Sequence, residues 1–143
     1  MGEGLCSDAG HEFLEHTADL GIRAWGPAPE RAFEEAALAL VRVLDVPAER
    51  GEDTVRVELD AEDRGGLLVA LLNELVFLVE TRGQGVAAVH VLEVAEQTLV
   101  AEVGLGTVAH RPEGTVVKAA TYHRLSVEVE PGGATVVRVF LDV

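Results

Sequence analysis

The chain is predicted to be α+β, a two-layer sandwich in which two helices pack on one face of a mixed, mostly antiparallel sheet. Three observations predict this class: segments of alternating apolar and polar residues, two segments with apolar residues three and four positions apart, and two alternating runs around Pro131-Gly132-Gly133. A length of 143 residues suits one domain with a sizeable core. We expect a disordered tail over residues 1–12 and a single domain over residues 13–143.

The first half of the domain is predicted to run strand, helix, strand. Residues 20–25 alternate as a half-buried strand, with Asp19 just before it on the polar row. Residues 30–44 have the apolar spacing of an amphipathic helix, and Pro29 is tolerated at a first helical position. Residues 54–60 alternate again, which predicts a second strand with one wet face.

A more apolar helix is predicted from Asp63 or Gly66 to Arg82, with Gly83 as its C-cap. Apolar residues cover most of its circumference, so this helix is either largely buried or packed against another chain. Its polar interior positions are Asn73, Glu74 and Glu80. Strands over residues 86–94 and 98–103 follow, and then a turn-rich loop that carries His110.

The last predicted element is a β-hairpin over residues 116–143. Strict alternation divides its first strand into an apolar row and a solvent-side row, the latter containing Lys118, Tyr122, Arg124, Glu128 and Glu130. Thr121 and His123 interrupt the apolar row, so His123 is either a hydrogen-bonded core histidine or part of a functional face. On the second strand, alternation puts Asp142 on the open face.

The formal net charge of −14 argues against strong, direct binding of nucleic acid, which depends on patches of Lys and Arg. A basic protein partner, a divalent cation or simple solubility would each explain the acidity. The single cysteine, Cys6, allows no intramolecular disulfide and suggests a reducing compartment. No targeting or membrane-spanning pattern is evident, so we expect a cytoplasmic protein that binds no membrane.

Asp19 and Asp142 are the strongest candidates for chemistry. Carboxylates are hard oxygen donors that suit Ca, Mg or Mn, provided that the two ends of the chain meet. The alternative is that both aspartates are solvated or cap turns. His16, three residues before Asp19, would face the other way in a regular strand, although a bend there could bring both to one pocket; the simpler interpretation is a loop histidine bonded to backbone.

Two segments resemble the archease family. They are Glu15-His16-Thr17-Ala18-Asp19-Leu20-Gly21-Ile22, and Val117-Lys118-Ala119-Ala120-Thr121-Tyr122-His123 with a final Leu141-Asp142-Val143; the resemblance extends from about Phe13 to Val143. It implies a divalent cation, Ca, Mg or Mn, bound by Asp19, Asp142 and Val143. It also implies that His16, Lys118, Tyr122 and His123 belong to a functional or partner-contacting face.

The resemblance further implies an accessory role rather than catalysis. Archeases activate the GTP-dependent RtcB-type RNA-splicing ligase in tRNA splicing and RNA repair, by promoting guanylylation of the ligase and multiple turnover. Two other functions stay open. One is a small metal-dependent hydrolase that uses the same carboxylates to activate water; the other is a chaperone-like module whose apolar second helix binds partners. Metal dependence would separate the accessory role and the hydrolase from the chaperone-like module. Activity without a ligase would separate the hydrolase from the accessory role.

Overall fold

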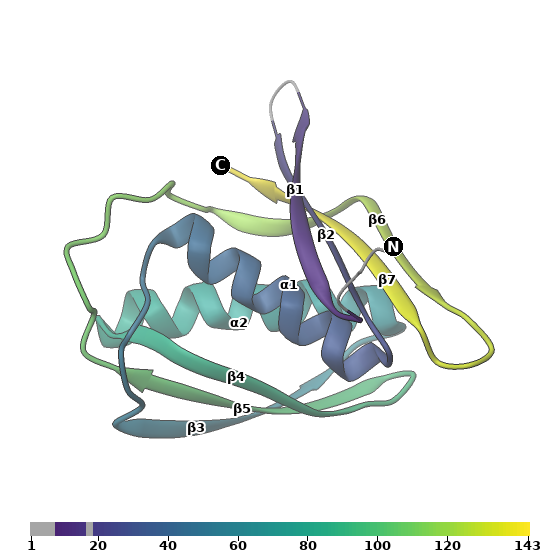
Figure 1. Cartoon of the computed structure of the whole chain (residues 1–143), viewed down its shortest axis with the longest axis horizontal. Coiled ribbons are helices and arrows are strands. Elements are labelled where there is room, and N and C mark those ends of the chain that lie inside the picture. The colour runs from purple at the N-terminus through teal and green to yellow at the C-terminus, as the bar shows by residue number, and fades with distance from the viewer. Residues whose placement is uncertain (1–7, 17–18) are drawn as a thin grey trace.

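The computed structural model describes residues 8–16 and 19–143 (Figure 1). The strands are β1 (Gly10–His16), β2 (Asp19–Gly26), β3 (Asp53–Asp60), β4 (Gly85–Val94), β5 (Thr98–Gly106), β6 (Ala119–Val129) and β7 (Thr135–Asp142). The helices are α1 (Pro29–Leu44) and α2 (Arg64–Arg82). Neither described helix combines the length and apolar character that a membrane crossing requires.

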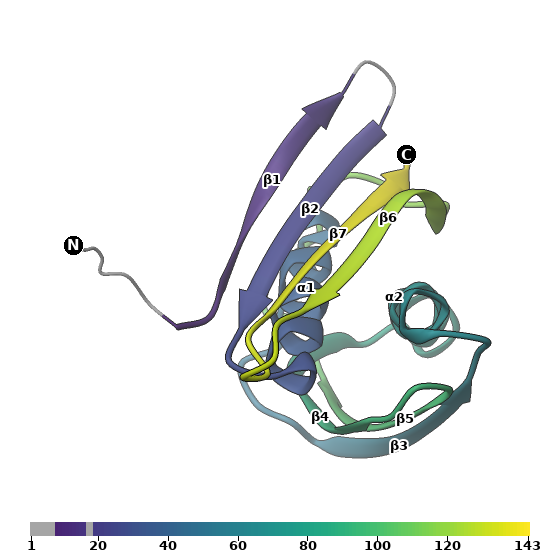
Figure 2. The same cartoon turned by 90° about the vertical axis from the view of Figure 1, so that its right-hand side faces the viewer.

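The strands form two sheets, one with the order β1-β2-β7-β6 and one with the order β3-β5-β4. Every strand pair is antiparallel, and an isolated parallel bridge joins Pro47 to Val86. Both helices lie between the sheets (Figure 2). The predicted α+β class, with two helices packed against antiparallel strands, is confirmed. Alternation within single segments did not predict the division into two sheets, because it carries no information on which strands pair.

Helix α1 begins and ends as the sequence indicates. Pro29 occupies its first turn, and Asp45 ends it in a left-handed conformation with φ of 56°. Its apolar stripe is buried in the core, but two of its acidic side chains bind the backbone of β4. Glu34 accepts a hydrogen bond from the Val91 N–H at 2.8 Å, and Glu30 accepts one from the Val94 N–H at 3.0 Å. These carboxylates therefore cover the edge of the three-stranded sheet.

Helix α2 supplies much of the core. Asp63 caps its N-terminus by accepting a hydrogen bond from the Gly66 N–H at 2.8 Å, and Gly83 ends it with φ of 64°. The fully buried leucines of α2 are Leu67, Leu68, Leu71, Leu72 and Leu75. The expected burial of this helix is thus confirmed within one chain, and Phe77 is its one large apolar side chain classed as exposed.

A register shift in β6 reverses the predicted faces of Ala119, Ala120 and Thr121, whereas the rest of the hairpin keeps its predicted faces. Thr121 pairs with Phe140 and Ser126 pairs with Arg138, so β6 advances five residues while β7 advances two. An odd difference inverts the alternation across the bulge. Ala120 is therefore buried on the helix side before the bulge, and the continuous solvent-side row expected for β6 does not exist.

Two further expectations need correction. His123 is exposed in the bulged segment, so it is not a core histidine.

Strand β1 begins at Gly10, so residues 10–12, which were expected to belong to a tail, pair with β2. The polar residues among Gly10–His16 hid this strand, because period-two alternation is weak there. The rest of the expected tail at residues 1–7, including Cys6, lies outside the described residues.

Candidate functional site

The two candidate aspartates lie directly opposite each other on neighbouring strands. Asp19 of β2 is the register partner of Asp142 of β7. Such partners project from the same face of a sheet, with Cβ atoms about 4.5–5.5 Å apart. Ile22 and Val139, also partners, are fully buried on the helix side, so alternation puts both aspartates on the opposite, open face. The condition that the two ends of the chain must meet is therefore satisfied.

The other members of the predicted site surround this pair unequally. Val143 follows Asp142 and is 41% exposed. The Lys118 N–H donates a hydrogen bond of 2.8 Å to the carbonyl oxygen of Asp142, which fixes the backbone of Lys118 beside it. His16 pairs with Asp19 through its backbone position in β1, and its side chain lies outside the description.

An apolar layer lies next to the aspartate pair on the same face. Gly21 pairs with Phe140, and a Cβ at Gly21 would lie only 2.6 Å from Cε2 of the phenyl ring. The glycine therefore lets the ring lie across β2, which explains why Phe140 is buried although it points away from the core. Apolar surroundings lower the local dielectric and strengthen the interaction of neighbouring carboxylates with a cation.

The chemistry of the pair fits a hard divalent cation. Like charges directly opposite each other destabilise a sheet, and a cation between them would remove that cost. Within the described ranges, no group of three or more His, Cys, Asp or Glu side chains is placed to hold a metal ion. Two carboxylates would therefore need further oxygens from backbone, from Val143 or from water, which suits Ca, Mg or Mn better than Zn.

Tyr122 and His123 do not join the aspartate pair in one row. Tyr122 is 67% exposed and lines an open pocket of about 550 Å³ between the start of α2, the β4–β5 turn and β6. Asp63, Gln97 and Leu125 are among the other lining residues. The bulge thus turns Tyr122 toward α2, whereas Ala119 and Thr121 share the face of Asp142 by alternation.

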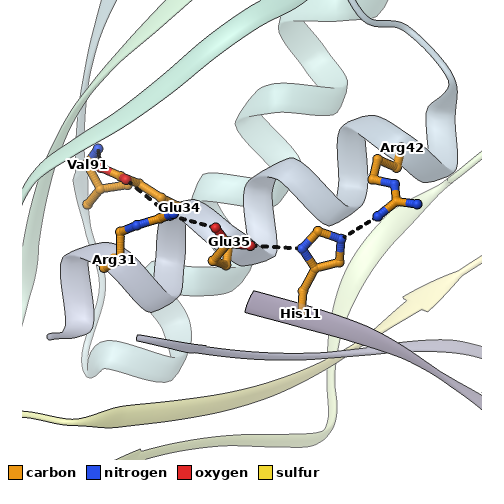
Figure 3. Close-up of polar contacts among 6 residues, drawn as sticks. All are labelled: His11, Arg31, Glu34, Glu35, Arg42 and Val91. Carbon is orange, nitrogen blue, oxygen red and sulfur yellow. Dashed lines mark hydrogen bonds and ion pairs between the residues drawn. The ribbon is translucent and has the colours of Figure 1, made fainter. Parts of the chain in front are cut away.

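Sequence reasoning missed a polar network that fastens β1 to α1 (Figure 3). Nδ1 of His11 lies 2.9 Å from Oε1 of Glu35, and Nη1 of Arg42 lies 3.1 Å from Nε2 of His11. Because Arg42 can only donate, Nε2 must accept and Nδ1 must carry the hydrogen toward Glu35. Arg31 lies 2.7 Å from the other oxygen of Glu35.

The network holds β1 near Ala24, the register partner of His11, which is at the other end of β2 from Asp19. Glu35 is only 7% exposed, and its contacts with His11 and Arg31 offset the cost of burying a polar side chain. No signal in the sequence points to Glu35, because it is two residues from Phe33 and from Ala37 and so lies outside the predicted apolar stripe of the helix. Its partner His11 lies in another element, so the sequence does not distinguish Glu35 from the other acidic residues near the start of α1.

Comparisons with known proteins give a consistent result. The model of the Archease protein family (MTH1598/TM1083) matches residues 11–143. The chain is 36% identical to protein archease of Methanosarcina mazei over 132 residues, which is 86% of this chain and 89% of that relative. It is 32% identical to protein archease of Pyrococcus furiosus over 139 residues, or 92% of this chain and 97% of that relative.

Two solved structures have the same fold. The solution structure of Methanobacterium thermoautotrophicum protein 1598 has a TM-score of 0.71 and 32% identity, over 94% of this chain and 99% of that one. A crystal structure from Thermotoga maritima, described as an archease and possible chaperone, has a TM-score of 0.63 over 91% of this chain and 94% of that one. At 21% identity, the second shows likeness of fold alone. By its family match and its curated relatives, this chain belongs to the archease family.

Proposed function

We propose that this protein is an accessory factor that activates a GTP-dependent RNA-splicing ligase of the RtcB type. The observation that carries the proposal is the register pairing of Asp19 with Asp142, which joins the two segments that resemble the family. The ligase performs the covalent chemistry, joining a 3′-phosphate or 2′,3′-cyclic phosphate end to a 5′-hydroxyl end in tRNA splicing and RNA repair. This chain promotes guanylylation of the ligase and multiple turnover, in the cytoplasm.

Asp19 and Asp142, with an oxygen of Val143, would hold a divalent cation, Ca, Mg or Mn. When bound, the cation supplies positive charge that phosphate oxygens or carboxylates of a partner can share. The chain's own contribution is to present two carboxylates at one end of a sheet, on its open face, beside the buried ring of Phe140. These groups dock near the nucleotide and Mn site of the ligase.

The contact with the ligase is proposed to include β6 and the residue before it. Lys118 is the only lysine of the chain and is exposed next to Asp142. Residues 114–127 contain Lys118, His123 and Arg124 but no Asp or Glu, in a chain with a net charge of −14. This acid-free segment is suited to an acidic part of a protein partner. If the single variants Lys118→Ala and Tyr122→Ala both activate the ligase normally, these two residues do not belong to the contact.

The test is multiple-turnover joining of a 3′-phosphate RNA to a 5′-hydroxyl RNA by the host's ligase, with GTP and Mn²⁺. Wild-type protein is expected to increase the number of turnovers, and Asp142→Ala is expected to fail. Asp60→Ala is the matched control, since Asp60 is an exposed aspartate at the end of β3. No stimulation by wild type, with a ligase competent for one round, would overturn the proposal.

The same variants address the two other functions. A metal-dependent hydrolase would act on its substrate without any ligase, and Asp142→Ala would abolish that activity. A chaperone-like module would need an apolar binding surface. Its expected source, α2, buries Leu67, Leu68, Leu71, Leu72 and Leu75 inside this chain. The buried helix therefore favours the accessory function over the chaperone-like one.

A further inference from the structure

The side chain of Asn73 in α2 holds the backbone of Ala120 in β6 at two points. The Ala120 N–H donates a hydrogen bond of 2.8 Å to Oδ1 of Asn73, and Nδ2 of Asn73 donates one of 3.5 Å to the Ala120 carbonyl oxygen. Asn73 is the only asparagine of the chain. Its carboxamide offers the same donor and acceptor as a peptide group, so it acts as a one-residue neighbouring strand.

The position of Ala120 explains why such a partner is needed. Strand β6 is at the edge of its sheet, and before the bulge only Ala119, Ala120 and Thr121 pair with β7. Ala120 is 5% exposed, so water cannot easily satisfy its outward peptide groups. An unpaired N–H at such a position is unfavourable, because it has lost its hydrogen bonds to water. The carboxamide of Asn73 removes this cost and holds the short paired segment against α2.

Helix stability alone does not favour asparagine at this position. Neighbouring positions of α2 are Leu71, Leu72 and Leu75, and leucine is a better helix former than asparagine. The partly buried carboxamide must also lose water, which is unfavourable unless it is hydrogen-bonded. Its two bonds to Ala120 are therefore the reason for a polar side chain here.

The segment that Asn73 holds is bonded in turn to the strand that carries Asp142. The Lys118 N–H donates to the Asp142 carbonyl oxygen at 2.8 Å, and Oγ1 of Thr121 donates to the Phe140 carbonyl oxygen at 3.2 Å. These two bonds lie on either side of Ala120. The contacts thus form a continuous path from the carboxamide of α2, through the backbone of residues 118–120, to the backbone of Asp142.

We propose that Asn73 is a positioning residue for the Asp19–Asp142 site. It fixes residues 118–121, and these fix the backbone from which the carboxylate of Asp142 projects. This inference rests on the proposed function, because it assumes that the pair binds a divalent cation. Groups that hydrogen-bond a metal ligand directly typically change metal affinity about 10- to 100-fold when they are removed, and Asn73 lies one step farther out, so we expect an effect at the lower end of that range.

The test uses Mn²⁺ titration of the full chain by calorimetry, with three variants. Asn73→Leu removes both bonds and is expected to weaken Mn²⁺ binding about 10-fold. Asn73→Asp keeps the acceptor for the Ala120 N–H and is expected to bind Mn²⁺ with intermediate affinity. Val76→Ala is the control for general destabilisation, since Val76 is a buried residue of α2 that makes no bond to Ala120; it should bind Mn²⁺ like wild type.

Hydrogen exchange provides a second measurement that is independent of the metal. The amide of Ala120 should exchange faster in Asn73→Leu than in Val76→Ala, when both are compared with wild type. Wild-type affinity in Asn73→Leu would overturn the inference, and so would an equal loss in Val76→Ala. If Asn73→Leu does not fold, unchanged affinity in Asn73→Asp with unchanged Ala120 exchange would also overturn it. Absence of Mn²⁺ binding by wild type would instead overturn the proposed metal site.

Discussion

Asp19 and Asp142 face each other across β2 and β7, so the free protein holds two like charges at one register position. Without a divalent cation, Asp142→Asn should therefore raise the free energy of unfolding by up to about 1 kcal/mol. With Mn²⁺ the order should reverse, because only wild type gains stability from binding. Urea unfolding with EDTA or with Mn²⁺ measures both effects. Asp60→Asn is the control, and an equal gain from Mn²⁺ in Asp142→Asn would contradict the prediction.

A second prediction concerns Arg124, which has a φ of 58° within the bulge of β6. A non-glycine residue pays about 1–2 kcal/mol for this left-handed conformation, and glycine does not. The greater flexibility of glycine in the unfolded chain offsets part of that gain. Arg124→Gly should thus raise the free energy of unfolding by about 0.5–1 kcal/mol. In contrast, Arg56→Gly, at an exposed position of β3 without positive φ, should lower it; a loss of stability in both variants would refute the argument.

A third prediction concerns a pair of like charges farther along the open face. Arg23 of β2 is the register partner of Arg138 of β7. Arg23 lies 3.3 Å from Glu12 and over the ring of Trp25, whereas Arg138 has no ion-pair partner among residues 8–16 and 19–143. Arg138→Glu should raise the free energy of unfolding by about 0.5 kcal/mol at low salt. The gain should shrink in 1 M salt, which screens exposed charges, and a gain independent of salt would point to another cause.

A fourth prediction concerns the network around Glu35. His11→Ala removes one partner of this buried carboxylate and should lower the free energy of unfolding by about 1–3 kcal/mol. Amides of β1 should exchange hydrogen faster, while those of β2 that pair with β7 stay protected. Glu12→Ala is the control, because Glu12 is exposed on the opposite face of the same strand. Equal exchange of β1 in the two variants would show that the network does not hold the strand.

Local patterns predicted the elements well, because each element depends on its own residues. The spacing of apolar residues gave both helices, and Pro29 and Gly83 indicated where α1 begins and where α2 ends. The aspartates were a different case. Alternation placed Asp142 on an open face, but only the resemblance linked it to Asp19, and the register of β2 and β7 now gives that link a geometry.

The errors came from features that depend on contacts between distant segments. Thr121 and His123 interrupt the apolar row, but such an interruption does not by itself indicate a bulge, and Thr and Tyr are both enriched in regular strands. That one irregularity explains why Ala120 lies on the core side and Ala119 and Thr121 do not, whereas Lys118 and Tyr122 are exposed as predicted. Similarly, Asn73 was recognised as a polar position of an apolar helix, but its function depends on Ala120, 47 residues away.

The carboxylates of Glu30 and Glu34 have a consequence for how molecules of this protein meet. An edge strand with free N–H groups is a template on which another chain can add a strand. On β4 the N–H groups of Val91 and Val94 are already bound by α1, as Asn73 binds Ala120 on β6. Polymerisation by strand addition is therefore hindered at one edge of each sheet, and the opposite edges, β1 and β3, are where crowded molecules would begin to aggregate.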